Sequence, residues 1–128
     1  MKTIRSILVA IISIAFIFYF RYSQTDEARV ERFANNSRDS IAEKMKPYLD
    51  DTVELEISAQ NKSLIIAYRY KKAEDVVSSR TAHDLLRAQK STAQSILDDL
   101  KRSGIKSPVV SVRYLHPTGE FIMAQKLK

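Results

Sequence analysis

A run of fifteen residues without a charged side chain, residues 6–20, constrains this chain more than any other feature. Lys2 and Arg5 precede the run, Arg21 ends it, and polar residues follow. A helix that is apolar on all sides does not suit the surface of a small domain. A basic start, an apolar core and a polar exit are typical of segments that the export machinery places in a membrane. The sequence therefore predicts a signal-anchor or transmembrane segment over residues 1–22, which contacts the membrane through residues 4–22.

Cleavage of this segment would yield a secreted protein, and retention would yield an anchored one. As a helix the uncharged run spans about 22 Å, shorter than the hydrocarbon core of about 30 Å, so its length fits either outcome. The one small-x-small triplet is residues 13–15, and cleavage after it would leave an exposed aromatic terminus at residues 16–20. We therefore expect a retained anchor, with secretion after cleavage as the alternative.

The basic residues around the segment indicate its orientation. Lys2 and Arg5 favour a cytoplasmic amino terminus, which predicts a single-pass protein of the plasma membrane with its domain outside. Arg21, Arg29, Arg32 and Arg38 follow on the other side and weaken this orientation, but the short, signal-like head still favours it. The chain has no cysteine, so it has neither a disulfide nor a cysteine for lipid attachment.

The remaining residues, about 105, suffice for one domain with one hydrophobic core. The net charge of +6 falls to about +3 when Lys2, Arg5 and Arg21 are set aside, and acids and bases are interspersed along the rest. A mixed surface of this kind is unlike the clustered basic face of a nucleic-acid-binding protein, so the sequence disfavours a nucleic-acid partner.

Apolar residues recur at helical spacing after the anchor, and we expect a membrane-proximal helix within residues 23–50. Polar residues 35–37 weaken its centre, which leaves one helix or two in tandem. Pro47 and the acidic pair Asp50 and Asp51 end it. Residues 51–128 then form a separate globular unit.

The period changes to two from Val53 onward. A hairpin that turns at residues 61–62 opposes Val53 with Tyr70 and Leu55 with Tyr68, and it also opposes Glu54 with Arg69. Apolar and charge pairing agree on this register.

One long amphipathic helix is predicted over residues 74–103, ended by Gly104. A second hairpin follows, in which Tyr114 opposes Phe121 and Val112 opposes Met123. The predicted fold class is therefore α+β: an amino-terminal anchor helix, then α-ββ-α-ββ. Its four-stranded antiparallel sheet is covered on one face by helix.

The other face of this sheet is the candidate partner face. Alternation places charged side chains there, with apolar residues Ile65, Ile122 and Ala124 among them: Glu54, Glu56, Arg69, Lys71, Arg113 and Lys126. Such a face is either solvated or a site for a protein or envelope partner.

The hairpin at residues 53–68, the helix end at 97–105 and the strand at 109–115 together resemble a family of unknown function. Its members are small exported proteins of Gram-positive bacteria, often tethered as lipoproteins. The resemblance covers residues 40–127 and implies fold and location but no catalytic motif. The lipoprotein cysteine is missing here, so the tether must differ.

The sequence contains no motif that predicts a catalytic, metal or cofactor site. His83 and His116 are the two histidines, and no zinc-binding spacing surrounds them. Tyr68, Tyr70 and Tyr114 alternate with the apolar set, which favours core packing over a base-stacking platform. We expect a non-catalytic interaction domain. An inhibitor or immunity-type binder of an exported protein is one specific version of this expectation. An enzyme with a dispersed site and a binder of nucleic acid or anionic polymer are the alternatives.

Overall fold

The computed structural model describes residues 25–128, and the predicted anchor at residues 1–22 lies outside them. Within residues 25–128, no helix combines the length and apolarity that crossing a bilayer requires. The elements, in chain order, are α2 (Asp26–Met45), η1 (Lys46–Tyr48), β1 (Val53–Gln60), β2 (Ser63–Tyr70), η2 (Ala73–Asp75), α3 (Ser79–Ala88), α4 (Lys90–Arg102), β3 (Val109–Leu115) and β4 (Phe121–Leu127).

The helix after the predicted anchor is one continuous helix, α2. Thr25 caps it, because the Thr25 hydroxyl accepts a hydrogen bond from the Ala28 amide at 3.2 Å. Its apolar stripe is buried in the same core cluster as the sheet, so the polar centre at residues 35–37 interrupts neither the helix nor its packing. A 3-10 turn that contains Pro47 follows its end.

The first hairpin has the predicted register. Val53 opposes Tyr70, Leu55 opposes Tyr68, and Glu54 opposes Arg69. Asn61 takes the positive φ of 55° that the tight turn requires.

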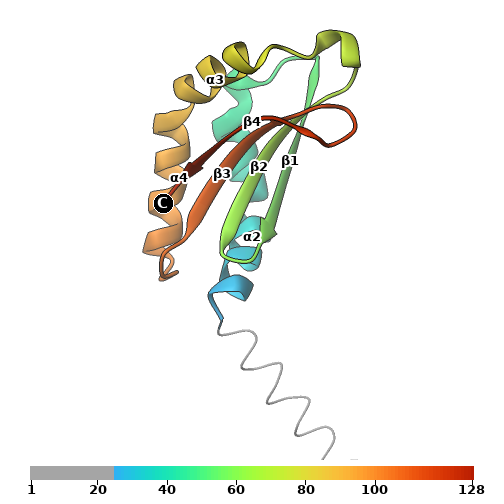
Figure 1. Ribbon diagram of the computed structural model, residues 1–128. Helices are drawn as coiled ribbons and strands as arrows, with labels where there is room; N and C mark the ends of the chain where they lie inside the picture. Colours follow the sequence, from blue (N-terminus) through green and yellow to red (C-terminus); the bar gives the residue numbers. More distant parts are fainter. Residues whose placement is uncertain (1–24) are drawn as a thin grey trace, which may run out of the picture.

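The sheet is mixed, so the expectation of an all-antiparallel sheet was wrong. Its strand order is β1-β2-β3-β4, and β2 runs parallel to β3 while both outer pairs are antiparallel. The helical connection between β2 and β3 explains this, because α4 carries the chain back along the sheet before β3 begins (Figure 1).

The predicted single helix over residues 74–103 is also wrong in its start and its continuity. Ser78 caps α3 by accepting a hydrogen bond from the Thr81 amide at 3.2 Å, so α3 begins at Ser79. The chain then bends at Gln89, whose side chain is buried and donates a hydrogen bond to the Tyr114 hydroxyl at 2.7 Å. The helix after the bend ends as predicted, because Gly104 has a φ of +84°.

The second hairpin is shifted from the predicted register. Phe121 opposes Leu115, Met123 opposes Tyr114, and the step between these pairs contains a β-bulge. The extra residue, Ile122, packs against the main core and not on the candidate partner face. Phe121 turns outward instead and is 58% exposed.

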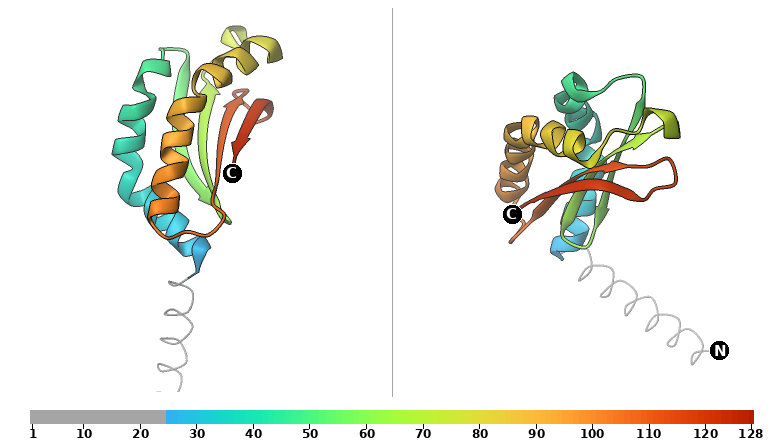
Figure 2. Two further views of the ribbon diagram at one scale, coloured as in Figure 1. Left: turned by 90° about the vertical axis from the view of Figure 1, so that its left-hand side faces the viewer. Right: turned by 45° about the horizontal axis from the view of Figure 1, so that its top comes forward.

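Helices α2 and α4 cover one face of the sheet, and α3 lies across one end (Figures 1 and 2). The core between them includes the stacked rings of Tyr68 and Tyr114, whose centroids are 4.9 Å apart. Tyr68, Tyr70 and Tyr114 are all buried, which confirms their predicted role in packing. No helix of residues 25–128 lies over the second face of the sheet (Figure 2). We call this second face the outer sheet face.

Candidate protein-binding face

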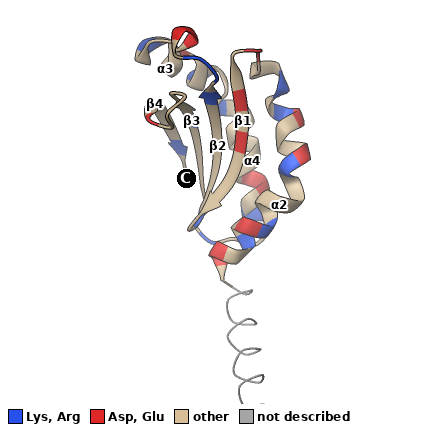
Figure 3. Cartoon of the chain, turned by 90° about the vertical axis from the view of Figure 1, so that its right-hand side faces the viewer, with Lys and Arg blue, Asp and Glu red and all other residues tan. Residues whose placement is uncertain are grey.

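The outer sheet face carries most of the predicted charged residues on alternate strand positions. Glu54 and Glu56 lie on β1, Arg69 on β2, Arg113 on β3 and Lys126 on β4. The strand registers place these positions on one face, and Lys71 follows directly after β2. None of the six side chains is buried. Acidic colour marks β1 and basic colour marks β4 in Figure 3, so the face is acidic at one edge and basic at the other.

A small apolar cluster lies at the centre of this face. Ile65, Ala67 and Leu115 are buried there and form a cluster separate from the main core. No helix of the described part of the chain covers them, and neighbouring side chains shield them from solvent (Figure 2). Phe121 opposes Leu115 across the β3–β4 pair and extends this apolar surface to the outside.

Arg113 and Phe121 form a paired feature on the outer sheet face. The guanidinium carbon of Arg113 lies 4.7 Å from the centroid of the Phe121 ring, which is a cation–π contact. Arg113 Nε also donates a hydrogen bond to the Ser111 hydroxyl at 3.1 Å. These two contacts hold the guanidinium in place. Arg113 and Lys126 have no carboxylate at ion-pair distance within the described part of the chain.

Arg69 is engaged differently. Its Nε lies 3.1 Å from Glu56 Oε1, and its Nη2 donates to Glu56 Oε2 at 3.3 Å. Arg69 therefore pairs with Glu56 and not with Glu54, the residue that opposes it in the register. Gly119, in the β3–β4 turn, lies close above this pair, since a Cβ there would be 3.9 Å from Arg69 Nη2. The positive charge of Arg69 on this face is thus largely offset by Glu56.

The buried polar groups belong to the core. Burial raises the pKa of Tyr114 to about 12, and the hydrogen bond from Gln89 opposes that shift. Burial also raises the pKa of Tyr68. Asp50 accepts hydrogen bonds from the side chain and the amide of Thr52, and these bonds lower the pKa of Asp50. This carboxylate therefore stabilises the turn that precedes β1.

The cavity beside His83 is lined by no carboxylate. His83 lines a cavity of about 280 Å³ together with Arg87, Lys90 and Gln125. A larger cavity of about 580 Å³ lies between α2 and the end of α4, lined by Arg29, Arg32, Phe33, Asn36, Ser37 and Ser103. Within residues 25–128, no three His, Asp or Glu side chains are grouped as metal ligands would be.

Sequence reasoning found the charged residues of the outer sheet face but missed Phe121. Strict alternation placed Phe121 inward beside Tyr114, and the bulge at Ile122 reverses it. Leu115 could have been found, because it has the same parity as Ser111 and Arg113 on β3.

Residues 30–127 match a protein family described as a domain of unknown function, DUF4854. The match spans most of the chain, and the chain belongs to this family. Membership agrees with the expected uncharacterised family. The expected export, lipoprotein relatives and Gram-positive origin stay predictions. No curated protein matches the chain.

The fold is similar to that of a pilotin, EpsS, from the type 2 secretion system of Vibrio vulnificus. The two are 13% identical with a TM-score of 0.50, and the alignment covers 80% of this chain and 91% of that chain. The type II secretion system pilotin AspS from Vibrio cholerae is also 13% identical, with a TM-score of 0.43 and coverage of 80% and 92%. At such identity the likeness to EpsS is one of fold.

Proposed function

We propose that this protein is a small non-catalytic binding domain, tethered at the membrane, whose outer sheet face holds a segment of a partner protein. The observation that carries the proposal is Phe121. This aromatic ring is 58% exposed, lies on the outer sheet face, and has the Arg113 guanidinium stacked on it.

Aromatic residues and arginine are the types that most often carry binding energy at protein interfaces. The exposed ring of Phe121 offers an apolar contact, whereas Ile65, Ala67 and Leu115 are buried and belong to the packing of the sheet itself. Arg113 is already oriented and lacks a carboxylate partner within the described residues, so little conformational freedom is lost when a partner's carboxylate pairs with it. The expected partner segment therefore presents an apolar side chain beside an acidic one.

The fold likeness to a pilotin supports a binding role over a catalytic one, since EpsS is named as a component of a secretion system. Tethering through residues 4–22 and a location outside the plasma membrane belong to the same proposal. They rest on the charge pattern of the amino-terminal segment.

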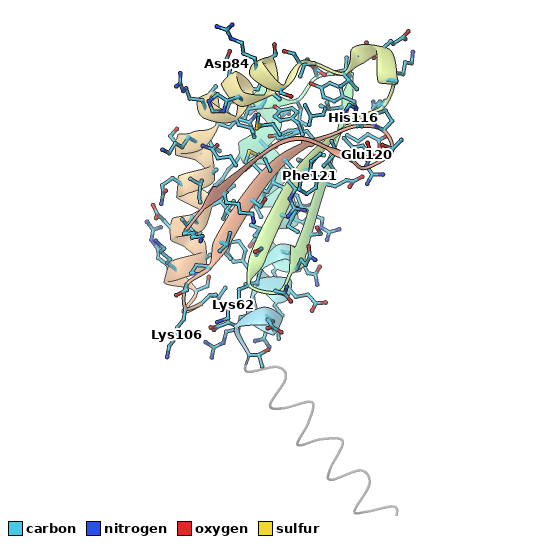
Figure 4. The ribbon with its side chains drawn as sticks, viewed as in Figure 1. Lys62, Asp84, Lys106, His116, Glu120 and Phe121 are labelled. Carbon is cyan, nitrogen blue, oxygen red and sulfur yellow. The ribbon has the colours of Figure 1, made fainter. Side chains whose placement is uncertain are left out.

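Site-specific photocrosslinking of the full chain in its native cells tests this role. A photoreactive amino acid replaces Phe121 in one variant and Asp84 in a matched control. Asp84 is exposed on α3, away from the outer sheet face (Figure 4). We expect a discrete adduct at position 121 that is absent at position 84.

Charge reversal sharpens the result. Arg113→Glu should reduce the adduct at position 121, because it removes the cation that pairs with the partner's carboxylate. Arg80→Glu, an exposed change on α3, should leave it unchanged. Equal adducts at both positions, or none at position 121, would contradict the proposal.

A further inference from the structure

Three segments meet at the end of the domain where α2 begins. Lys62 of the β1–β2 turn lies 3.7 Å from Asp26 Oδ2 in the first turn of α2. Arg29 donates to the Gly104 carbonyl at 3.3 Å, which joins α2 to the loop after α4. Figure 4 shows Lys62 and Lys106 together at this end, with Asp84, His116 and Glu120 at the opposite one.

This end carries an excess of exposed cations. The side chain of Arg102 is 78% exposed and that of Lys62 is 50% exposed. Lys101 and Lys128 line one cavity together with Ser107 of the α4–β3 loop, so they belong to the same end. We call the set of five the basic end: Lys62, Lys101, Arg102, Lys106 and Lys128.

The acids of this end, Asp26 and Glu27 in the first turn of α2 and Asp99 of α4, offset only part of the charge of the five cations. Asp26 is mostly buried and is paired with both Arg29 and Lys62. Arg102 is paired with Asp99, which also contacts Lys44. Lys101, Lys106 and Lys128 have no carboxylate at ion-pair distance among the described side chains, so their charge is available to a ligand.

The opposite end differs in charge. Acidic residues of its loops, turns and α3 stand among the bases Lys46, Lys71, Lys72 and Arg80: Asp50, Asp51, Glu74, Asp75, Asp84 and Glu120. The cation excess is therefore confined to the end where α2 begins.

The predicted anchor precedes α2 directly, so it relates this difference in charge to the membrane surface. The predicted segment ends at Tyr22, and only residues 23–25 separate it from α2. Three residues of any conformation span at most about 10 Å, which is close to the Debye length of about 8 Å at physiological salt. The basic end is thus held where the field of a charged membrane surface is still felt.

We propose that the basic end rests on anionic phospholipid headgroups and so fixes the orientation of the domain on the membrane. The sheet extends from this end toward the opposite one, and the outer sheet face therefore stays clear of the bilayer (Figure 1). Each Lys or Arg near an anionic surface strengthens association about fivefold. This orientation rests on the proposed tether through residues 4–22 but not on what the outer sheet face binds.

Lipid-quenched fluorescence of the full chain tests the contact. The chain has no native cysteine, so Gln60→Cys and Asp84→Cys each give one labelling site, the first at the basic end and the second at the opposite end. The labelled protein is reconstituted in phosphatidylcholine vesicles with headgroup spin labels, with and without phosphatidylglycerol. We expect phosphatidylglycerol to increase quenching at position 60 but not at position 84, and high salt to reverse the increase.

Charge-neutral variants test whether the lysines of the basic end cause the increase in quenching. Lys62→Gln, Lys101→Gln and Lys106→Gln combined should lower quenching at position 60 to the value in phosphatidylcholine alone. The matched control combines Lys71→Gln, Lys72→Gln and Arg80→Gln at the opposite end and should change nothing. If quenching at position 60 does not change when phosphatidylglycerol is added, the proposal is overturned. A response to soluble polyglutamate without a response to phosphatidylglycerol also overturns it, in favour of an acidic protein.

Discussion

The hydrogen bond between Gln89 and Tyr114 joins the bend between α3 and α4 to the sheet, and Tyr114→Phe tests how much it stabilises the fold. The Gln89 amide nitrogen donates to the Tyr114 hydroxyl at 2.7 Å, and Gln89 is only 1% exposed. Removing the hydroxyl leaves a buried amide donor without a partner, which costs about 1–3 kcal/mol. For a domain of this size each kcal/mol lowers Tm by about 4–8 °C.

The assay is thermal and urea unfolding of the full chain in a mild detergent, followed by near-ultraviolet circular dichroism. Tyr48→Phe is the matched control. The Tyr48 hydroxyl bonds to the Thr92 hydroxyl at 3.0 Å in a partly buried site. Water can replace that bond, so the control should lose less than about 1 kcal/mol.

A double-mutant cycle completes the test. Gln89→Leu combined with Tyr114→Phe removes both polar groups, so the pair should lose less stability than the sum of the single variants. The expected coupling is about 0.5–3 kcal/mol. A Tyr114→Phe variant as stable as the wild type, or additive losses in the double variant, would show that this hydrogen bond does not stabilise the fold.

Further predictions concern pH, the β3–β4 turn and the core. Burial raises the pKa of Tyr114 to about 12, so the folded state favours the neutral phenol. The contribution of Tyr114 to the free energy of unfolding is complete below its usual pKa near 10 and is lost towards pH 12, at up to about 1.4 kcal/mol per pH unit. Urea unfolding at alkaline pH should therefore show a smaller loss of stability per pH unit in Tyr114→Phe. Gly119 has a φ of +93°, so Gly119→Ala should cost about 1–2 kcal/mol in urea unfolding, and an unchanged midpoint would contradict the turn. Leu97 is fully buried, so Leu97→Ala should cost about 2–5 kcal/mol, whereas Leu85→Ala at an exposed position should cost about 1 kcal/mol or less.

The elements with local determinants were predictable from the sequence. The first hairpin follows from strict alternation, because each apolar pair and the opposition of Glu54 and Arg69 point to one register. The end of α4 follows from Gly104, whose left-handed backbone suits glycine.

The elements that depend on distant contacts were not predictable. No local signal in β3 says whether it pairs with β2 or β1, or in which direction, so the parallel pairing was missed. The bend at Gln89 is joined by a hydrogen bond to Tyr114, which lies 25 residues away in the sequence. An amphipathic pattern continues through the bend and conceals it.

The candidate face shows the same division. Its charged residues follow from alternation in β1, β2 and β3, where strand parity is unbroken. Phe121 lies beyond a bulge, and one extra residue reverses the face of every side chain on the far side of it. The residue that best supports a binding role was therefore the one that the sequence pattern placed in the core.

The most direct test of the binding role is the affinity of the captured partner segment for the wild-type protein and for Phe121→Ala. An aromatic residue at the centre of an interface contributes about 2 kcal/mol or more, so Phe121→Ala should weaken binding about thirtyfold or more. Leu85→Ala removes the other exposed large apolar side chain of the described residues and should leave the affinity unchanged. Equal affinities of wild type and Phe121→Ala would contradict the assignment of the outer sheet face as the binding site.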